Sequence, residues 1–192
     1  MQYHFPPASY SRLRVVLHWI SASVIIWAIC SGFFAVAHVP SSPVRQLIGA
    51  INPQLTTLFI PFFALRLGLY LQSQPWRAWG NRPAAENAAA FGHGLLYLCI
   101  TLVLISGLLI MPHKWMLLGI LPIPALVHNQ HDLARLGAAH GCLCTFLALL
   151  IAGHVSAVLW HQLSGRSVLG RMMFQPRALY PGSKNSEILK KI

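Results

Sequence analysis

The stretch that decides the fold runs from Leu136 to His161 and reads LGAAHGCLCTFLALLIAGHVSAVLWH. It contains no Asp, Glu, Lys or Arg. A helix needs about 20 mostly apolar residues to cross the hydrocarbon core of a bilayer, and this stretch is longer than that. Two histidines, His140 and His154, interrupt the apolar run. The stretch therefore predicts a membrane-spanning helix that carries imidazoles inside the span.

Three further stretches have the same apolar character, namely Val15–Val36, Leu47–Leu71 and Ala88–Met111. The whole chain of 192 residues is 56% hydrophobic and only 9% charged. A soluble domain carries about 25% charged residues, so a soluble fold is excluded. We therefore predict an all-α fold, a bundle of four transmembrane helices.

The remaining parts of the chain are assigned by length and composition. Trp115–Val127 is apolar but too short to span, and it contains two prolines, so we expect it to lie along the membrane surface or to cap the bundle. Residues 1–174 are predicted to form the transmembrane domain. Residues 175–192 are predicted to form a polar cytoplasmic tail.

The basic residues predict the orientation. With both termini in the cytoplasm, only Arg45, Lys114 and Arg135 of the fourteen Lys and Arg residues lie outside, which leaves eleven inside. Cytoplasmic loops of membrane proteins carry such an excess of Lys and Arg. The net charge of +11 would suit nucleic acid only on a soluble fold with a basic face. We expect anionic membrane lipid as the partner instead, and no nucleic acid.

Histidines deep in a span are costly to insert and are therefore candidate functional residues; His18, His140 and His154 are of this kind. His140 and His154 are fourteen residues apart, so they share a helix face and lie about 21 Å apart along the axis. Metal–imidazole bonds are about 2 Å long, so the two cannot bind one ion. Nearby, Gly137 and Gly141 form a small-x-x-x-small pair, which predicts that another helix approaches closely.

Each of these histidines needs a partner on another helix, and a flat macrocycle held between spans would provide one. Iron porphyrin takes axial histidines, and its apolar rim suits the core of a bundle. His18 and His154 both lie toward the cytoplasmic ends of their spans and can reach one depth, so they are the predicted ligands of the haem iron. Membrane histidines also serve transport sites, proton relays and interhelical hydrogen bonds, and spacing alone leaves these alternatives open.

Short motifs extend the pattern along the chain, in the order Ser11-Arg12-Leu13, His18-Trp19, Leu65-Arg66-Leu67, Gly92-His93 with Tyr97, Ser106-Gly107, His140, His154, His161 and Arg171-Met172-Met173. Taken together, from about Ser11 to Phe174, they resemble the bacterial cytochrome b561 family, which groups with the cytochrome b subunits of nickel–iron hydrogenases. The resemblance implies a four-helix bundle with two b-type haems, one above the other, in the bacterial cytoplasmic (inner) membrane. His18 and His154 would hold the cytoplasmic haem b. His140 and a histidine near the start of the second span would hold the outer one.

The second span departs from this family pattern. The position fourteen residues before Arg66 holds Asn52, and the span contains no histidine. An amide is a poor substitute for an imidazole at haem iron. The outer haem is therefore expected to be absent, to be five-coordinate on His140, or to take a loop residue such as His131 or His38 as its sixth ligand.

A haem with two axial histidines has no vacant position and suits one-electron transfer. We therefore expect an electron-transport protein of the respiratory chain whose partner is quinone. His93 and His161 are candidates for handling the protons of quinone, and Arg12 and Arg66 for pairing with haem propionates. Alternatives are a superoxide:quinone oxidoreductase (superoxide oxidase), a haem-bearing membrane anchor that docks a redox protein, and a proton-relaying transporter.

Overall fold

Four long helices and one short hairpin make up the computed structural model, which describes residues 11–73, 83–111 and 113–165. The helices are α1 (Arg12–Val36), α2 (Pro43–Gln72), α3 (Ala84–Leu109) and α4 (Gln130–Leu163). Each is long and apolar enough to cross a membrane, which confirms the four predicted spans. The predicted tail, residues 175–192, and the last family motif lie outside the described residues.

Polar capping residues explain why the helices begin a few residues before the apolar runs. The side chain of Ser11 accepts a hydrogen bond from the Arg14 amide at the start of α1, and Ser42 does the same for Arg45 at the start of α2. Asn129 caps α4 by accepting from the amide of His131. Such side chains satisfy amides of the first turn that have no partner within the helix.

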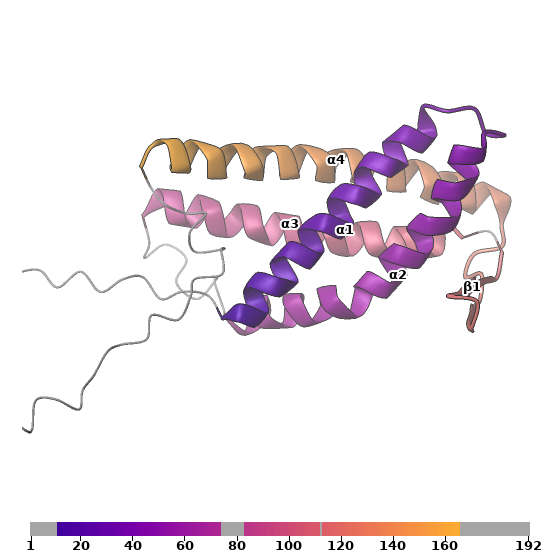
Figure 1. The fold of residues 1–192 in the computed structure, drawn as a ribbon, viewed down its shortest axis with the longest axis horizontal. Helices are drawn as coiled ribbons and strands as arrows, with labels where there is room; N and C mark the ends of the chain where they lie inside the picture. The colour runs from indigo at the N-terminus through magenta and orange to yellow at the C-terminus, as the bar shows by residue number, and fades with distance from the viewer. Residues whose placement is uncertain (1–10, 74–82, 112, 166–192) are drawn as a thin grey trace, which may run out of the picture.

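The helices are arranged as two packed pairs. α1 packs along α2 and α3 along α4, while α2 makes the further contact with α3 (Figure 1). The start of α1 and the end of α4 lie at the end of the bundle opposite to the hairpin (Figure 1). We call these the inner and outer ends, respectively.

An apolar layer fills the middle of the bundle. It consists of Phe59, Phe63, Cys99, Ile100 and Leu147. Leu147 is only 1% exposed and lies midway between the two histidines of α4 in sequence. The polar residues of the interior therefore fall into two groups, one on either side of this layer.

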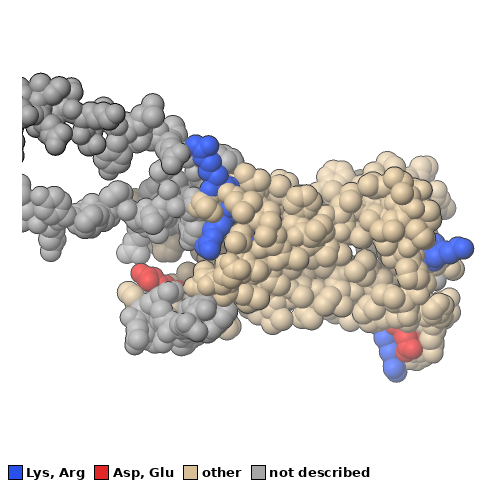
Figure 2. All heavy atoms as spheres, turned by 90° about the horizontal axis from the view of Figure 1, so that it is seen from below, with Lys and Arg blue, Asp and Glu red and all other residues tan. Residues whose placement is uncertain are grey.

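The outer surface of the bundle is apolar, as expected for contact with lipid. Large side chains such as Leu149 and Trp160 are 66% and 70% exposed. Figure 2 shows charged side chains at the two ends of the face in view and an uncharged belt between them. Only three of the predicted inner bases, Arg12, Arg14 and Arg66, fall within the described residues, so the orientation stays a prediction.

The short apolar stretch after α3 forms a hairpin, in which β1 (Trp115–Leu117) pairs antiparallel with β2 (Leu121–Ile123). Leu118 and Gly119 make the turn with φ of 53° and 72°. Gln54 of α2 holds the hairpin, since its Nε2 donates to Met116 O and its Oε1 accepts from the Leu118 amide, both at 2.8 Å. The stretch therefore caps the outer end of the bundle, and the predicted all-α fold gains one small two-stranded element.

Close approaches between helices occur at other glycines than those predicted. A Cβ added at Gly137 or Gly141 would meet nothing within 4 Å, so the predicted approach of another helix there was wrong for the helices of this chain. At Gly94 an added Cβ would lie 3.3 Å from the Tyr70 hydroxyl, and at Gly107 it would lie 3.4 Å from Cε1 of His140. These two glycines of α3 make room for polar side chains of α2 and α4.

Candidate functional site

Each helix contributes one polar side chain to a cluster toward the inner end of the bundle. The inner cluster consists of His18 on α1, Arg66 on α2, His93 on α3 and His154 on α4. At a rise of 1.5 Å per residue, each lies about 9–14 Å from the inner end of its helix. The two predicted iron ligands, His18 and His154, are therefore at a similar depth, on helices that belong to different pairs.

The residues of the inner cluster form two contacting pairs. Arg66 Nη2 donates to Nδ1 of His18 over 2.9 Å. The rings of His93 and His154 meet edge to face, with centroids 5.3 Å apart and planes at 66°.

Two stacked tyrosines pack beside Arg66. The guanidinium carbon lies 5.4 Å from the centroid of the Tyr97 ring, a cation–π contact. Tyr97 in turn stacks on Tyr70 at 4.2 Å with planes 25° apart. Tyr97 belongs to the family motif, whereas Tyr70 was not predicted from the sequence. Tyr70 could have been found, because it follows Arg66 by four residues and so shares its face of α2.

Two predicted site residues stay outside the inner cluster. Arg12 is exposed in the first turn of α1, and His161 lies in the last turn of α4, about 10 Å along the helix from His154. Within the described part of the chain, neither makes a hydrogen bond with the cluster. Of the seven predicted site residues, the structure thus gathers Arg66 and three histidines at the inner end, while His140 lies at the outer end.

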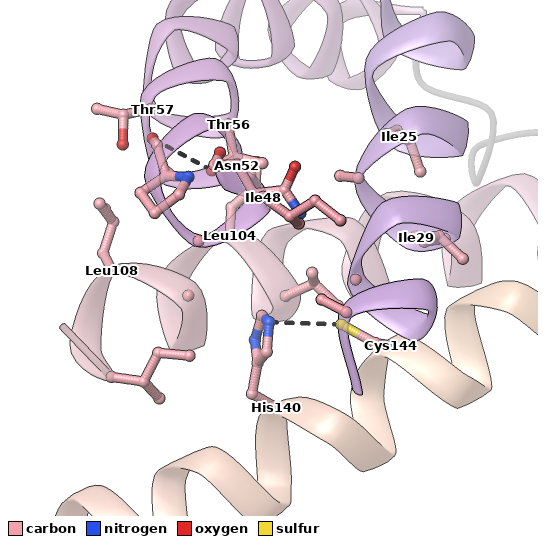
Figure 3. Close-up of a pocket in the computed structure, with 18 of the residues that line it drawn as sticks. Ile25, Ile29, Ile48, Asn52, Thr56, Thr57, Leu104, Leu108, His140 and Cys144 are labelled. Carbon is pink, nitrogen blue, oxygen red and sulfur yellow. Dashed lines mark hydrogen bonds between the residues drawn. The ribbon is translucent and has the colours of Figure 1, made fainter. Parts of the chain in front are cut away.

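A cavity of about 510 Å³ lies on the other side of the apolar layer, between the four helices and the hairpin. We call it the outer cavity. Its walls are mostly aliphatic, and its polar side chains are Arg45, Asn52, Thr56, Thr57, Trp115, His140 and Cys144. Figure 3 shows His140 rising from α4 into the space that Asn52 and Thr56 of α2 border from the opposite side.

We assign the Nδ1–H tautomer to His140 from its contacts. Ser106 Oγ donates to Val103 O at 3.1 Å, so its oxygen is left to accept from Nδ1–H of His140 at 2.8 Å. Nε2 then carries the lone pair. Its contact is the thiol of Cys144 at 3.4 Å, a weak donor (Figure 3). In this tautomer the acceptor nitrogen of His140 contacts a weak donor in a mostly apolar cavity.

Asn52 is fixed in the wall opposite His140. Its Oδ1 accepts from Ser31 Oγ of α1 over 3.0 Å. The residue after it, Pro53, has no amide hydrogen, so the Gly49 carbonyl one turn earlier lacks its helical partner. Pro61 has the same effect on the carbonyl of Thr57.

Two residues that line the outer cavity each have a buried polar atom without a hydrogen-bond partner in the described structure, Thr57 Oγ1 and Trp115 Nε1; protein atoms cover both, so neither faces the cavity. The suggested sixth ligands lie elsewhere. His38 packs its ring on Phe34 and hydrogen-bonds the Phe34 carbonyl at 2.7 Å, and neither it nor His131 lines the cavity. Among the described lining residues, His140 is therefore the single histidine.

Comparison with known families gives a match over most of the chain. A model of the family described as prokaryotic cytochrome b561 matches residues 9–175. This range includes the four helices, the inner cluster and the outer cavity.

Proposed function

The chain belongs to the prokaryotic cytochrome b561 family, and from this premise we propose that it transfers single electrons through one haem b held at the inner cluster by His18 and His154. The family and the four apolar helices support a membrane b-type cytochrome of electron transport. In this proposal the protein lies in the bacterial cytoplasmic membrane with both termini inside, and its electron partner is quinone from the lipid phase.

The observation that carries the proposal is that His18 and His154 lie at a similar depth, on helices that belong to different pairs. Two imidazoles from helices of different pairs are residues that would hold the iron of a haem, which would supply the one-electron chemistry. Within the described residues, no three His, Cys, Asp or Glu side chains converge as a site for a bare metal ion. The donor set therefore fits a haem and does not fit a three-ligand metal site.

Arg66 is the group that must change partner when iron is bound. An imidazole that ligates a metal through one nitrogen carries a proton on the other, and that N–H cannot accept from a guanidinium. The 2.9 Å hydrogen bond from Arg66 to His18 is then lost. We assign the freed guanidinium, still resting on Tyr97, to the propionates of the haem, where the hydrogen bonds are charge-assisted.

The other residues of the cluster orient the ligands. His93 contacts the His154 ring and limits its rotation. The haem, when bound, supplies the one-electron chemistry, and the protein sets its position and electrostatic surroundings. Within the described residues, no contact of Arg12 or His161 supports a role for either at this site.

Haem content tests the proposal. The purified protein should show b-type bands in a reduced-minus-oxidised spectrum, and pyridine haemochrome analysis should give one haem per chain. His18→Ala and His154→Ala should each lose that haem, whereas His38→Ala, the same substitution outside both sites, should keep it. His18→Met should retain haem with a raised potential, because methionine ligation has this effect. A fully helical His18→Ala protein with unchanged haem bands would refute the ligand assignment.

A superoxide oxidase is the second candidate function, and one feature favours it. Arg45 lines the outer cavity and donates to the His38 carbonyl at 3.0 Å, so a positive charge stands at the outer end where an anion would arrive. Addition of superoxide to protein supplied with quinone would then yield quinol faster than in buffer. A rate equal to that of buffer, from protein with full haem content, would rule this function out.

A further inference from the structure

Arg66 carries a charge inside the span of α2, and its direction needs a physical cause. It lies six residues before the end of the helix at Gln72, about 9 Å from the inner end. Charges are costly within a span, and long basic side chains extend toward the membrane surface, where the charged group meets water. In the structure the guanidinium instead donates to Nδ1 of His18 on α1, over 2.9 Å. Other contacts must therefore hold it at this depth.

Tyr70 stands on the route by which Arg66 would extend toward the inner end. It follows Arg66 by four residues, so it lies one turn closer to that end on the same face of α2. A helical side chain covers the turn on the N-terminal side of its own Cα, and for Tyr70 this is the turn that carries Arg66. Tyr70 is therefore placed to prevent the guanidinium from reaching the inner surface.

Tyr97 of α3 connects these two residues of α2. Its ring stacks on Tyr70 at 4.2 Å with planes 25° apart, and the Arg66 guanidinium carbon lies 5.4 Å from its centroid. Tyr97 also meets Phe63 of the apolar layer, with ring centroids 6.1 Å apart. Phe63 and Tyr70 lie one turn to either side of Arg66 on α2. Tyr97 therefore cannot shift along the bundle without losing one of these two aromatic contacts.

Gly94 makes room for the Tyr70 side chain on α3. A Cβ added at Gly94 would lie 3.3 Å from the Tyr70 hydroxyl, so the tyrosine would have to move by a few tenths of an ångström. At Gly68, which lies on α2 between Arg66 and Tyr70, an added Cβ would meet nothing within 4 Å. The close approach at Gly94 is therefore specific to the contact with Tyr70.

We propose that Tyr70 is a positioning residue, which keeps the Arg66 guanidinium at the inner cluster through its stack on Tyr97. Gly94 belongs to the same arrangement, because it admits the Tyr70 hydroxyl. A positive charge near a haem favours the reduced form, so the reduction potential depends on where this charge is held. The inference rests on the proposed function in taking haem as the group on which the charge acts.

Redox titration of the haem-loaded protein tests the proposal. Tyr70→Leu removes the ring and should lower the midpoint potential in the same direction as Arg66→Gln, by no more than that variant does. Tyr70→Phe keeps the ring and should retain the wild-type potential. In the Arg66→Gln background Tyr70→Leu should have no further effect, because the charge that it positions is gone. A Tyr70→Leu protein with a lower thermal midpoint but the wild-type potential, or an equal shift in both backgrounds, would overturn the positioning role.

Variants of Gly94 test the same arrangement with both tyrosine rings in place. Gly94→Ala should displace Tyr70 and lower the potential, whereas Gly68→Ala, the matched control on α2, should leave the potential unchanged. The double variant Gly94→Ala/Tyr70→Phe should return to the wild-type potential, because the hydroxyl that the new methyl group meets is absent. A shift that persists in the double variant would show that Gly94 does not act through Tyr70.

Haem content separates failure of this inference from failure of the proposed function. A haem-loaded protein whose potential ignores Tyr70→Leu would overturn the positioning role and leave the cytochrome standing. A wild-type chain that takes up no haem would overturn the cytochrome proposal. The ring ¹⁵N chemical shift of His18 Nδ1 would then report the position of Arg66 directly, and it should change in Tyr70→Leu but not in Tyr70→Phe. An unchanged shift in Tyr70→Leu would overturn the positioning role as well.

Discussion

Replacement of Asn52 with histidine should create a second haem site from the existing cavity. Asn52 lies nine residues into α2 from Pro43, about 14 Å, and His140 lies ten residues into α4 from Gln130, about 15 Å. The two positions are therefore nearly level below the outer end, on opposite sides of a cavity of about 510 Å³. An imidazole at position 52 would supply the axial ligand that the wild type lacks.

The expected magnitude is a change from one haem per chain to two, measured by pyridine haemochrome analysis against protein concentration. The new haem should disappear in the double variant Asn52→His/His140→Ala, which removes the other ligand and keeps the inner cluster. A haem count of one in a helical Asn52→His protein expressed with excess haem would refute the geometry from which this prediction is drawn.

Three other substitutions test separate parts of the structure. Leu147→Ala removes most of a side chain that is 1% exposed and should lower the free energy of unfolding by about 2–5 kcal/mol, measured as a lower thermal midpoint in detergent. Leu149→Ala, at an exposed site, should change the midpoint little. Arg66→Gln should keep the haem ligated by His18 but lower its reduction potential by tens of millivolts. One nearby positive charge is worth about 1–2 kcal/mol at an effective dielectric constant of about 20, and 59 mV corresponds to about 1.4 kcal/mol. An unchanged midpoint in a redox titration would contradict the propionate assignment. Gln54→Ala removes both hydrogen bonds to the hairpin and should speed hydrogen exchange in residues 115–123, while equal exchange rates would show that other contacts hold it.

The four spans could be predicted from the sequence because every helix that crosses a bilayer must be mostly apolar over about 20 residues. Long apolar runs identified all four, and the error lay at their ends, where Ser42 and Asn129 extend the helices into polar sequence. The hairpin was not predicted as strands, because each strand has only three residues and Pro122 lies in one of them. Proline is tolerated there because a two-stranded sheet has only edge strands.

The inner cluster was predictable and the outer cavity was not. Histidines inside spans are conspicuous, and the alternating direction of successive helices brings His18 and His154 to one depth. The partners at the outer end depend on tertiary structure, since Trp115 reaches the cavity only through a hairpin fixed by Gln54 far along the chain. The tautomer of His140 likewise depends on Ser106 of a neighbouring helix. Spacing within one helix carries no information of this kind.

The apolar layer around Leu147, Phe59 and Phe63 also determines which particle can travel between the two ends of the bundle. Proton hopping needs an unbroken chain of hydrogen-bonding groups, and these hydrocarbon side chains supply none, whereas electrons tunnel through such packing. Under the proposed function, charge that crosses this layer moves as an electron without an accompanying proton. Such transfer is electrogenic, and we expect its equilibrium to respond to voltage, by up to about 2.3 kcal/mol per 100 mV for a charge that crosses the whole membrane.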